Sequence, residues 1–205
     1  KFKINNPTLI LNIGGISNYT YCFNDTLAAK DIGPGNVLMD EYLKKTKGID
    51  YDKNGDIASS GNINKDIINQ FYEHEFYNVQ QKHSFDRNEF DFSFVKGLEF
   101  EDAVATLTYF TALIISQNIK KNFDNEIEII LCGGGRKNLT LVNHIKKLLK
   151  FKIKLIDEFN IDGDFIESQA FAYLSIRSYL KKIISYPNTT NDLNPVTGVE
   201  IKINY

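Results

Sequence analysis

The acidic residue Asp31 stands directly before the tight turn Gly33-Pro34-Gly35. A carboxylate at such a bend can cap the turn by accepting backbone hydrogen bonds. It can also act as a general base that takes a proton from a molecule bound above it. The second role fits a turn that follows a strand, because α/β sheets place their chemistry at strand ends. The residues alone leave both roles open.

Three glycine turns follow predicted strands and could hold a phosphate group. Glycine adopts positive φ easily and exposes backbone amides, which attract phosphate where a helix begins nearby. No turn ends in the Gly-Lys-Ser/Thr of a Walker A loop, and none has the spacing of a dinucleotide fingerprint. The pattern therefore predicts a nucleotide cleft of another class, formed by Gly14–Gly15, Gly33–Gly35 and Gly133–Gly135.

A second carboxylate, Glu167, lies at the start of the last predicted helix, which spans residues 164–182. Asp164 can cap this helix, and Glu167 follows it by three residues, so the pair matches a capping box. A purely structural role for Glu167 therefore competes with a role in chemistry.

The segment 50–61 begins like a calcium-binding loop, with Asp50 and Asp52 at the expected offsets. The twelfth position of such a loop needs a bidentate glutamate, but here it is Gly61. We therefore predict an ordinary turn at Asn54-Gly55.

The histidines at positions 74, 83 and 144 lack metal-site spacing, so no metal held by the protein itself is predicted.

Composition excludes several classes of partner. The 205 residues carry a net charge of −2, from 24 basic and 26 acidic side chains, so nucleic acid is not an expected ligand. No apolar run approaches the ~20 residues that cross a bilayer. The two cysteines, Cys22 and Cys132, lie in separate strand-like runs, which fits a reducing, cytoplasmic compartment.

The positions of these residues depend on a predicted α/β architecture. Strands come first, including a hairpin, and strand–helix alternation follows, so we expect a three-layer domain with a mixed sheet flanked by helices. Asn36 is a fitting N-cap for the first helix. Residues 51–102 are predicted to form short helices and loops. The predicted strands cover 8–15, 18–24, 27–32, 126–132 and 151–158, and the predicted helices cover 36–46, 101–123, 139–150 and 164–182.

Several stretches, in this order, resemble the anhydro-N-acetylmuramic acid kinases: LNIGGISN, DIGPGNVLMDEYL, YDKNGDIASSG, LTYFTALII, ILCGGGRKN and ESQAFAYLSIR, followed by YPNTT and PVTG. The resemblance spans nearly the whole chain. It implies the two-lobed actin/hexokinase-like fold, with residues 1–205 as the C-terminal lobe, and the use of Mg-ATP. It also implies hydrolytic opening of the 1,6-anhydro ring of the sugar with phosphorylation of O6, a step of peptidoglycan recycling.

The resemblance also assigns roles to individual residues. Asp31 matches the general base that activates the attacking water, and Glu167 matches a glutamate near the reacting sugar. Gly14 and Gly15 would line the second phosphate loop. The run Gly133, Gly134 and Gly135 would border the adenosine. The residues that complete the rigid turn and position the substrate would be Gly33, Gly35 and Asn36, and magnesium would arrive with ATP.

Some positions depart from the family pattern. In QQKHSFDRNEF, Gln81, Lys82 and His83 replace a Pro-Pro-Lys segment, which bears on how the muramic sugar is admitted. The late Thr-Thr-Gly of the family is Thr189-Thr190-Asn191, and Phe159-Asn160 replaces a glycine after Asp-Glu. A second hypothesis is therefore an actin-like nucleotide-binding or regulatory module without sugar chemistry. A third, a Rossmann-type domain, requires an all-parallel sheet.

The expected partners are the sugar, ATP and a second lobe. The N-terminal lobe of the family, with its Gly-Thr-Ser-x-Asp-Gly phosphate loop, does not occur in this sequence. We therefore expect the 205-residue chain alone to be inactive, since it supplies one wall of the cleft. The family also tends to form homodimers.

Overall fold

A computed structural model describes residues 6–24, 26–72, 90–123, 127–190 and 193–198. The substituted segment Gln81–His83 lies outside these ranges, as does Asn191. The predictions made for those residues therefore rest on the sequence alone.

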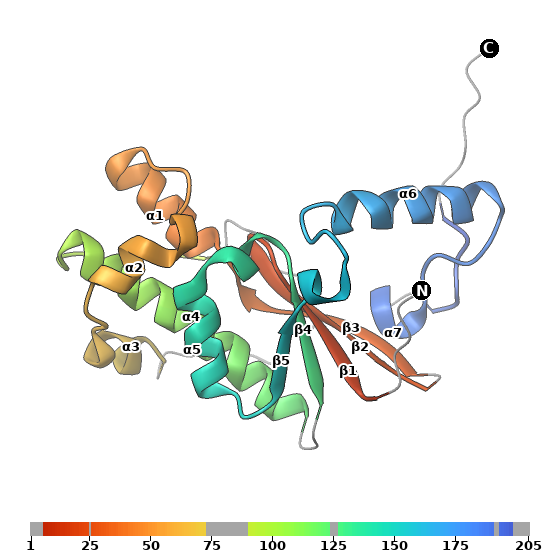
Figure 1. The fold of residues 1–205 in the computed structure, drawn as a ribbon, viewed down its shortest axis with the longest axis horizontal. Coiled ribbons are helices and arrows are strands. Elements are labelled where there is room, and N and C mark those ends of the chain that lie inside the picture. Colours follow the sequence, from red (N-terminus) through yellow and green to blue (C-terminus); the bar gives the residue numbers. More distant parts are fainter. Residues whose placement is uncertain (1–5, 25, 73–89, 124–126, 191–192, 199–205) are drawn as a thin grey trace, which may run out of the picture.

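The centre of the fold is a five-stranded mixed sheet in the order β3-β2-β1-β4-β5 (Figure 1). β1 pairs antiparallel with β2, and β2 antiparallel with β3, whereas β1–β4 and β4–β5 are parallel. The predicted mixed sheet with an antiparallel hairpin is confirmed, and the all-parallel Rossmann hypothesis is wrong. The strands are Thr8–Ile13 (β1), Ile16–Phe23 (β2), Thr26–Pro34 (β3), Glu128–Cys132 (β4) and Lys152–Leu155 (β5).

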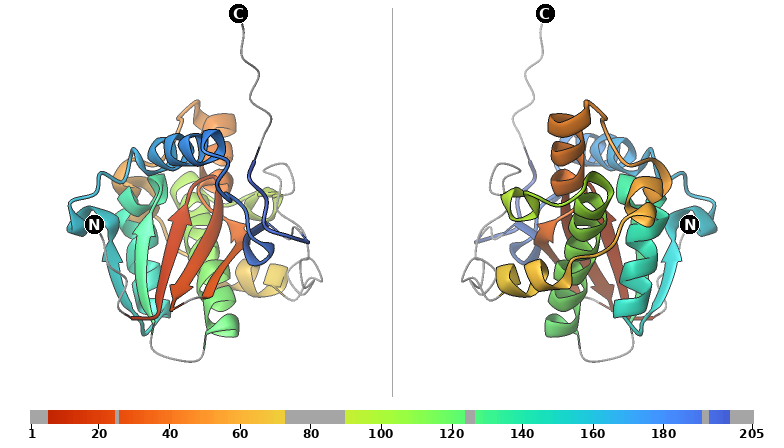
Figure 2. Two further views of the ribbon diagram at one scale, coloured as in Figure 1. Left: turned by 90° about the vertical axis from the view of Figure 1, so that its right-hand side faces the viewer. Right: turned by 90° about the vertical axis from the view of Figure 1, so that its left-hand side faces the viewer.

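The main core lies between one face of the sheet and two helices. Alternate residues of β1, namely Leu9, Leu11 and Ile13, are fully buried on this face, as period-two side-chain alternation requires. Helices α4 (Phe100–Asn122) and α5 (Leu139–Leu148) cover it, and α4 contributes the buried ring of Phe110. In the right-hand view of Figure 2 these helices lie in front of the sheet.

Shorter helices complete the domain. Three helices pack against α4, namely α1 (Val37–Lys47), α2 (Asp56–Ser60) and α3 (Lys65–Tyr72). On the other face of the sheet, Ile130 and Cys132 pack under the connection from Ile156 to Ile166. The C-terminal part contains α6 (Ile166–Tyr179) and the short α7 (Pro187–Thr190). No described helix is long and apolar enough to cross a membrane.

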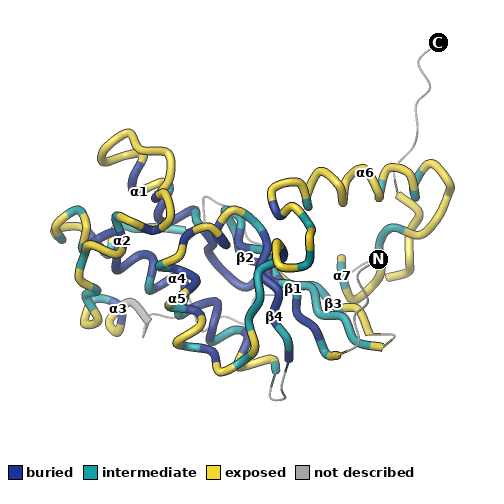
Figure 3. The backbone as a smooth tube through the Cα atoms, viewed as in Figure 1, coloured by how far each residue is buried: buried dark blue, intermediate teal, exposed yellow. Residues whose placement is uncertain are grey.

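Helix α6 differs from the other long helices because it has no buried residue. Figure 3 shows it as an exposed helix beside a sheet whose strands are mainly buried or intermediate. Its large apolar side chains nevertheless face solvent, including Phe171 at 64% exposure and Tyr179 at 72%. A helix whose aromatic residues are exposed, and whose contact with the core is made by Ile166 at its start, has a surface suited to another partner.

Candidate nucleotide and sugar site

Two of the predicted glycine turns are hydrogen-bonded to each other at one end of the sheet. The amide of Gly35 donates to the carbonyl of Gly15 at 2.8 Å, and the amide of Asn36 donates to the carbonyl of Gly14 at 2.8 Å. A Cβ on Gly35 would lie 2.2 Å from the Gly14 carbonyl oxygen, so only glycine permits this approach. The turn after β3 therefore crosses directly over the turn between β1 and β2.

The third glycine turn meets the same place from β4. Gly133 has φ of 78°, and a Cβ there would lie 2.4 Å from Asn12 Oδ1. A Cβ on Gly135 would lie 3.1 Å from Asn36 Oδ1, and one on Gly134 would be 3.7 Å from Asn36 Nδ2. The structure thus brings the three predicted glycine turns together around Asn36. This side chain occupies the N-cap position of α1 but makes no capping hydrogen bond, so the predicted capping role is wrong.

Asp31 lies at one end of a polar row that crosses four strands. It is paired in register with Asn18 of β2, Asn18 is paired with Asn12 of β1, and Asn12 with Cys132 of β4. Residues directly opposite each other in a sheet point to the same face, with Cβ atoms about 5 Å apart. The row lies on the face opposite the Leu9–Leu11–Ile13 core, and its three polar members are half-buried.

A register shift beside Asp31 fits a functional role. The β2–β3 pairing is interrupted between Ser17 and Asn18, next to the Asp31 partner. Such bulges occur often beside active sites, where they re-aim side chains. The buried hydroxyl of Ser17 donates to the Pro34 carbonyl at 2.9 Å and so helps to hold the turn after Asp31. Sequence reasoning missed Asn12 and Asn18, although polar residues at these positions interrupt an otherwise apolar strand.

Glu167 is not part of a capping box. The N-cap of α6 is Phe165, with no side-chain cap, and Asp164 instead accepts hydrogen bonds from Arg136 and Lys137. The structural alternative proposed for Glu167 is therefore wrong. Glu167 is exposed in the first turn of α6. It follows Asp164, the ion-pair partner of Arg136, by three residues along the chain.

A cavity of about 500 Å³ opens beside the third glycine turn. Pockets of this size hold ligands as large as nucleosides. The cavity is lined by α1, by the former calcium-loop candidate and by the turn after β4, through Asn36, Met39, Asp40, Asp50, Tyr51, Asp52, Lys53, Asn54, Gly134, Lys137 and Asn138. The predicted adenosine-bordering glycine Gly134 therefore lines a cavity large enough for the nucleoside.

The calcium-loop candidate has a structural function in this cavity wall. The carboxylate of Asp52, which is 6% exposed, accepts the amides of Ile57 and Ala58 at 2.9 and 3.0 Å. Asn54 and Gly55 both have left-handed backbone conformations, as the predicted turn requires. Asp52 thus holds the first turn of α2 against the loop.

An ion-pair cluster joins the third glycine turn to the connection before α6. The guanidinium of Arg136 is 4% exposed and binds Asp157 through two hydrogen bonds, Nε–Oδ2 at 2.7 Å and Nη2–Oδ1 at 3.1 Å. Its Nη1 binds Asp164 Oδ1 at 3.0 Å. The Arg136 guanidinium lowers the pKa of Asp157, and Lys137 together with Arg136 lowers that of Asp164.

These lowered pKa values predict acid sensitivity. A carboxyl whose folded pKa lies below its unfolded value stabilises the fold above the unfolded pKa, and this contribution is lost as pH falls through the folded pKa. The free energy of unfolding should therefore drop as pH falls below about 4, the usual aspartate pKa. In Asp157→Asn the free energy of unfolding should fall less between neutral and acid pH than in the wild type, as measured by urea unfolding. Equal pH dependence in wild type, Asp157→Asn and the exposed control Asp66→Asn would contradict the assignment.

The sheet order and the hydrogen-bonded glycine turns define the class as an actin/hexokinase-like α/β fold. Within this class, the chain belongs to the anhydro-N-acetylmuramic acid kinase family, whose model matches residues 2–199. The predicted family is therefore confirmed.

Curated relatives with this name are similar over nearly the whole chain. The protein of Pelagibacter ubique is 49% identical over 214 residues, which cover 99% of this chain and 57% of that protein. The protein of Zymomonas mobilis is 37% identical over 201 residues, or 97% of this chain and 55% of that protein. The chain thus spans about half the length of the curated relatives it matches.

Among solved structures, the activator of 2-hydroxyisocaproyl-CoA dehydratase from Clostridium difficile with bound ADPNP is similar, with a TM-score of 0.46 at 18% identity. That alignment covers 75% of this chain and 55% of the activator.

Proposed function

We propose that this chain is the C-terminal lobe of an ATP-dependent kinase acting on 1,6-anhydro-N-acetylmuramic acid. The kinase opens the anhydro ring by hydrolysis and phosphorylates O6, which gives N-acetylmuramic acid 6-phosphate for the recycling of peptidoglycan sugars. The observation that supports this most is the meeting of three glycine turns beside the row that ends in Asp31. Family membership supplies the substrate class.

In this proposal the glycine turns bind the nucleotide. Gly14 and Gly15 line the phosphates, and Gly133–Gly135 border the adenosine, which enters the cavity of about 500 Å³. The described residues fit ATP because the backbone is open at Gly14 and Gly134, where the atom nearest to an added Cβ would be 3.6 and 3.7 Å away. ATP brings its own magnesium ion, which neutralises charge on the transferred phosphoryl group.

Asp31 is the general base toward the water that attacks the anomeric carbon. The Ser17–Pro34 hydrogen bond and the hydrogen-bonded glycine turns hold the backbone that carries this carboxylate. A fixed base within hydrogen-bond reach of the water is what general base catalysis requires. Glu167 contacts the sugar from the first turn of α6.

Direct assay of the full-length kinase tests the proposal. Incubation with 1,6-anhydro-N-acetylmuramic acid, ATP and magnesium should yield equal amounts of ADP and of sugar phosphorylated at O6, measured by ³¹P NMR and mass spectrometry. The 205-residue chain alone should bind ATP without turnover. Nucleotide binding by the full-length protein without any sugar phosphate would favour the actin-like binding or regulatory module instead.

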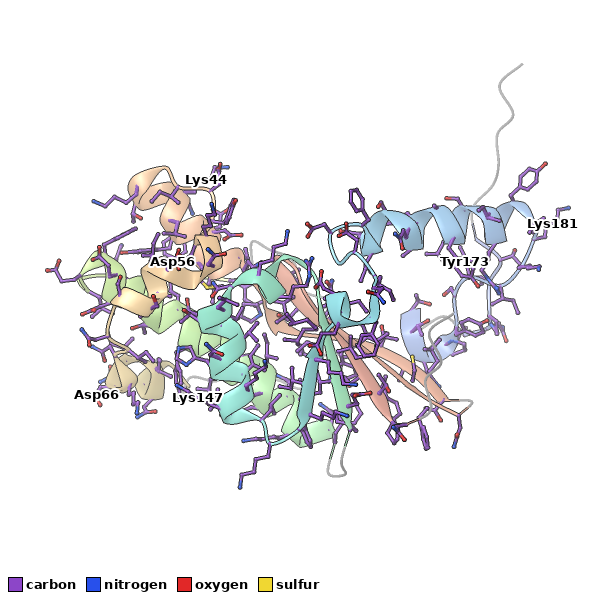
Figure 4. The ribbon with its side chains drawn as sticks, in the orientation of Figure 1. Lys44, Asp56, Asp66, Lys147, Tyr173 and Lys181 are labelled. Atoms are coloured by element: carbon purple, nitrogen blue, oxygen red, sulfur yellow. The ribbon has the colours of Figure 1, made fainter. Side chains whose placement is uncertain are left out.

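The exposed face of α6 is the contact surface for the rest of this kinase. Tyr173, Ile176 and Leu180 follow one another at helical spacing and are 59%, 60% and 54% exposed. Figure 4 labels Tyr173 on this helix and Lys181 just beyond its end. Because the relatives are nearly twice as long, a further lobe is available to cover this face.

The double variant Tyr173→Glu with Ile176→Glu separates this contact from folding of the lobe itself. In the 205-residue chain both side chains are exposed, so the free energy of unfolding should change by no more than about 0.5 kcal/mol. In the full-length kinase the same change should lower the melting temperature and the turnover number. An equal loss in both proteins would contradict the contact. A loss of dimer without loss of monomer stability, seen by ultracentrifugation, would assign the face to a second copy.

A further inference from the structure

One side chain ties the nucleotide turn to the segment that leads into α6. Arg136 belongs to the turn Gly134–Lys137, which continues the third glycine turn. Its Nη1 donates to the Gly133 carbonyl oxygen at 3.0 Å, so the guanidinium holds the glycine turn from within the protein. The side chain is only 4% exposed and therefore cannot move without moving its partners.

The same guanidinium holds the other segment at two points. Asp157, in the turn after β5, takes the paired contacts with Nε and Nη2, and Asp164, two residues before α6, takes the contact with Nη1. Gly163 lies so close that a Cβ would approach Arg136 Nε to 2.3 Å. The connection 157–164 is thus wrapped tightly around one planar cation.

A second cation adds to the cluster from the cavity side. Lys137 lines the cavity and pairs with the other oxygen of Asp164. Asp164 therefore receives one positive charge from the glycine turn and one from the cavity wall. Glu167 lies three residues further along the chain, in the first turn of α6.

An ion pair that only stabilised the fold would not need contacts with both the glycine turn and the connection before α6. A buried arginine must be paired because its desolvation is costly, and Asp157 alone provides a bidentate partner. The additional bonds to Asp164 and to the Gly133 carbonyl connect two segments. One is the glycine turn, to which the nucleotide is assigned, and the other leads into α6, where Glu167 is assigned to the sugar. A rigid planar donor with five N–H groups suits such a three-way junction, whereas lysine does not.

We propose that Arg136 is a positioning residue that couples the nucleotide-binding turn to the placement of Glu167. Binding of nucleotide at Gly133–Gly135 fixes the guanidinium, which then fixes the 157–164 connection and the first turn of α6. The inference rests on the proposed nucleotide site, and it adds an ordered dependence of sugar binding on nucleotide.

The test uses the full-length kinase with Arg136→Met and Arg136→Lys. Hydrogen exchange of residues 157–170 is measured with and without ADP, together with kcat and KM for both substrates. In wild type, ADP should slow exchange in this segment. In Arg136→Met this protection should be lost and kcat/KM for the sugar should fall at least about tenfold, the loss expected for one charged hydrogen bond. Arg136→Lys should lie between the two.

A matched control removes a different ion pair of the same sheet edge. Lys154 binds Glu128 at 2.7 Å between β5 and β4 and lies over the ring of Phe159, so it contacts the same connection without the glycine turn. Lys154→Met should leave both the ADP-dependent protection and kcat/KM close to wild type. If Arg136→Met does not fold, as judged by circular dichroism, Arg136→Lys and Asp157→Asn provide the same comparison.

The outcomes separate the inference from the proposed function. If ADP does not bind the wild-type kinase in calorimetry, the nucleotide site itself is wrong. If ADP binds but leaves exchange of 157–170 unchanged in wild type, or if all Arg136 variants keep wild-type protection and kcat/KM while only losing stability, the coupling is overturned. Full restoration of sugar kinetics in Arg136→Lys would also contradict the three-way junction.

Discussion

The variant Asp31→Asn in the full-length kinase should reduce turnover with the anhydro sugar by a factor of about 10² to 10⁴. An asparagine of the same shape cannot accept a proton from the attacking water, and a positioned general base contributes about this much to a rate. The affinity for ATP should stay close to wild type, because the glycine turns that hold it are not altered. Steady-state kinetics and calorimetric titration of ATP provide the two measurements.

Asp66→Asn is the matched control for Asp31→Asn. Asp66 is an exposed carboxylate in the first turn of α3, away from the glycine turns. Its replacement removes the same charge and should leave turnover unchanged. Wild-type turnover in Asp31→Asn would remove the mechanism, and a parallel loss of ATP affinity would indicate a structural role for Asp31 in the turn.

The second large effect is expected for Gly35→Ala. The added methyl group would meet the backbone carbonyl of Gly14 at 2.2 Å and that of Gly15 at 3.1 Å. Backbone atoms cannot rotate away as a side chain can, so the two turns must separate and lose the 2.8 Å hydrogen bond from Gly35 to Gly15. Overpacking of this kind costs about 3 kcal/mol, and urea unfolding of the protein would measure it.

Gly14→Ala in the same pair of turns is the control for that variant. Its Cβ would lie 3.6 Å from the nearest atom, the Ile16 carbonyl oxygen, and Gly14 is not among the glycines with positive φ. The free energy of unfolding should therefore change by less than about 1 kcal/mol. Equal destabilisation by Gly14→Ala and Gly35→Ala would show that the crossing of the two turns does not limit stability.

The sequence predicted the order and type of the main elements well. The apolar run Thr8–Gly15, ended by paired glycines, and the alternating β-rich run Asn18–Asn24 predicted the hairpin, because side chains alternate across a strand whatever it pairs with. The apolar spacing of Val104, Leu107 and Phe110 predicted the long helix α4 for a similar reason. Both signals depend only on residues close together in the sequence, so they can be recognised without knowing which element packs against the segment.

Local signals failed where a distant residue competed for the same group. Asp164 and Glu167 have the spacing of a capping box, yet Asp164 pairs with Arg136 and Lys137, which lie 28 and 27 residues earlier in the chain. Asn36 fails for a different reason: its backbone is helical (φ −77°, ψ −13°) and not extended as in most N-caps, and its side chain makes no cap bond. A charged or geometrically fixed partner outweighs a neutral cap, and sequence spacing carries no information about that competition.

The amino-acid sequence by itself determined the family, the strands and helices, and the glycine positions that permit close backbone approach. Only the tertiary structure decided that the three glycine turns meet, that Asn12 and Asn18 extend a row to Asp31, and that Arg136 joins the turn to α6. The physical reason is the separation along the chain over which each interaction acts. Backbone propensity and side-chain periodicity act between neighbours along the chain, whereas strand register and buried ion pairs join residues brought together only when the sheet has formed.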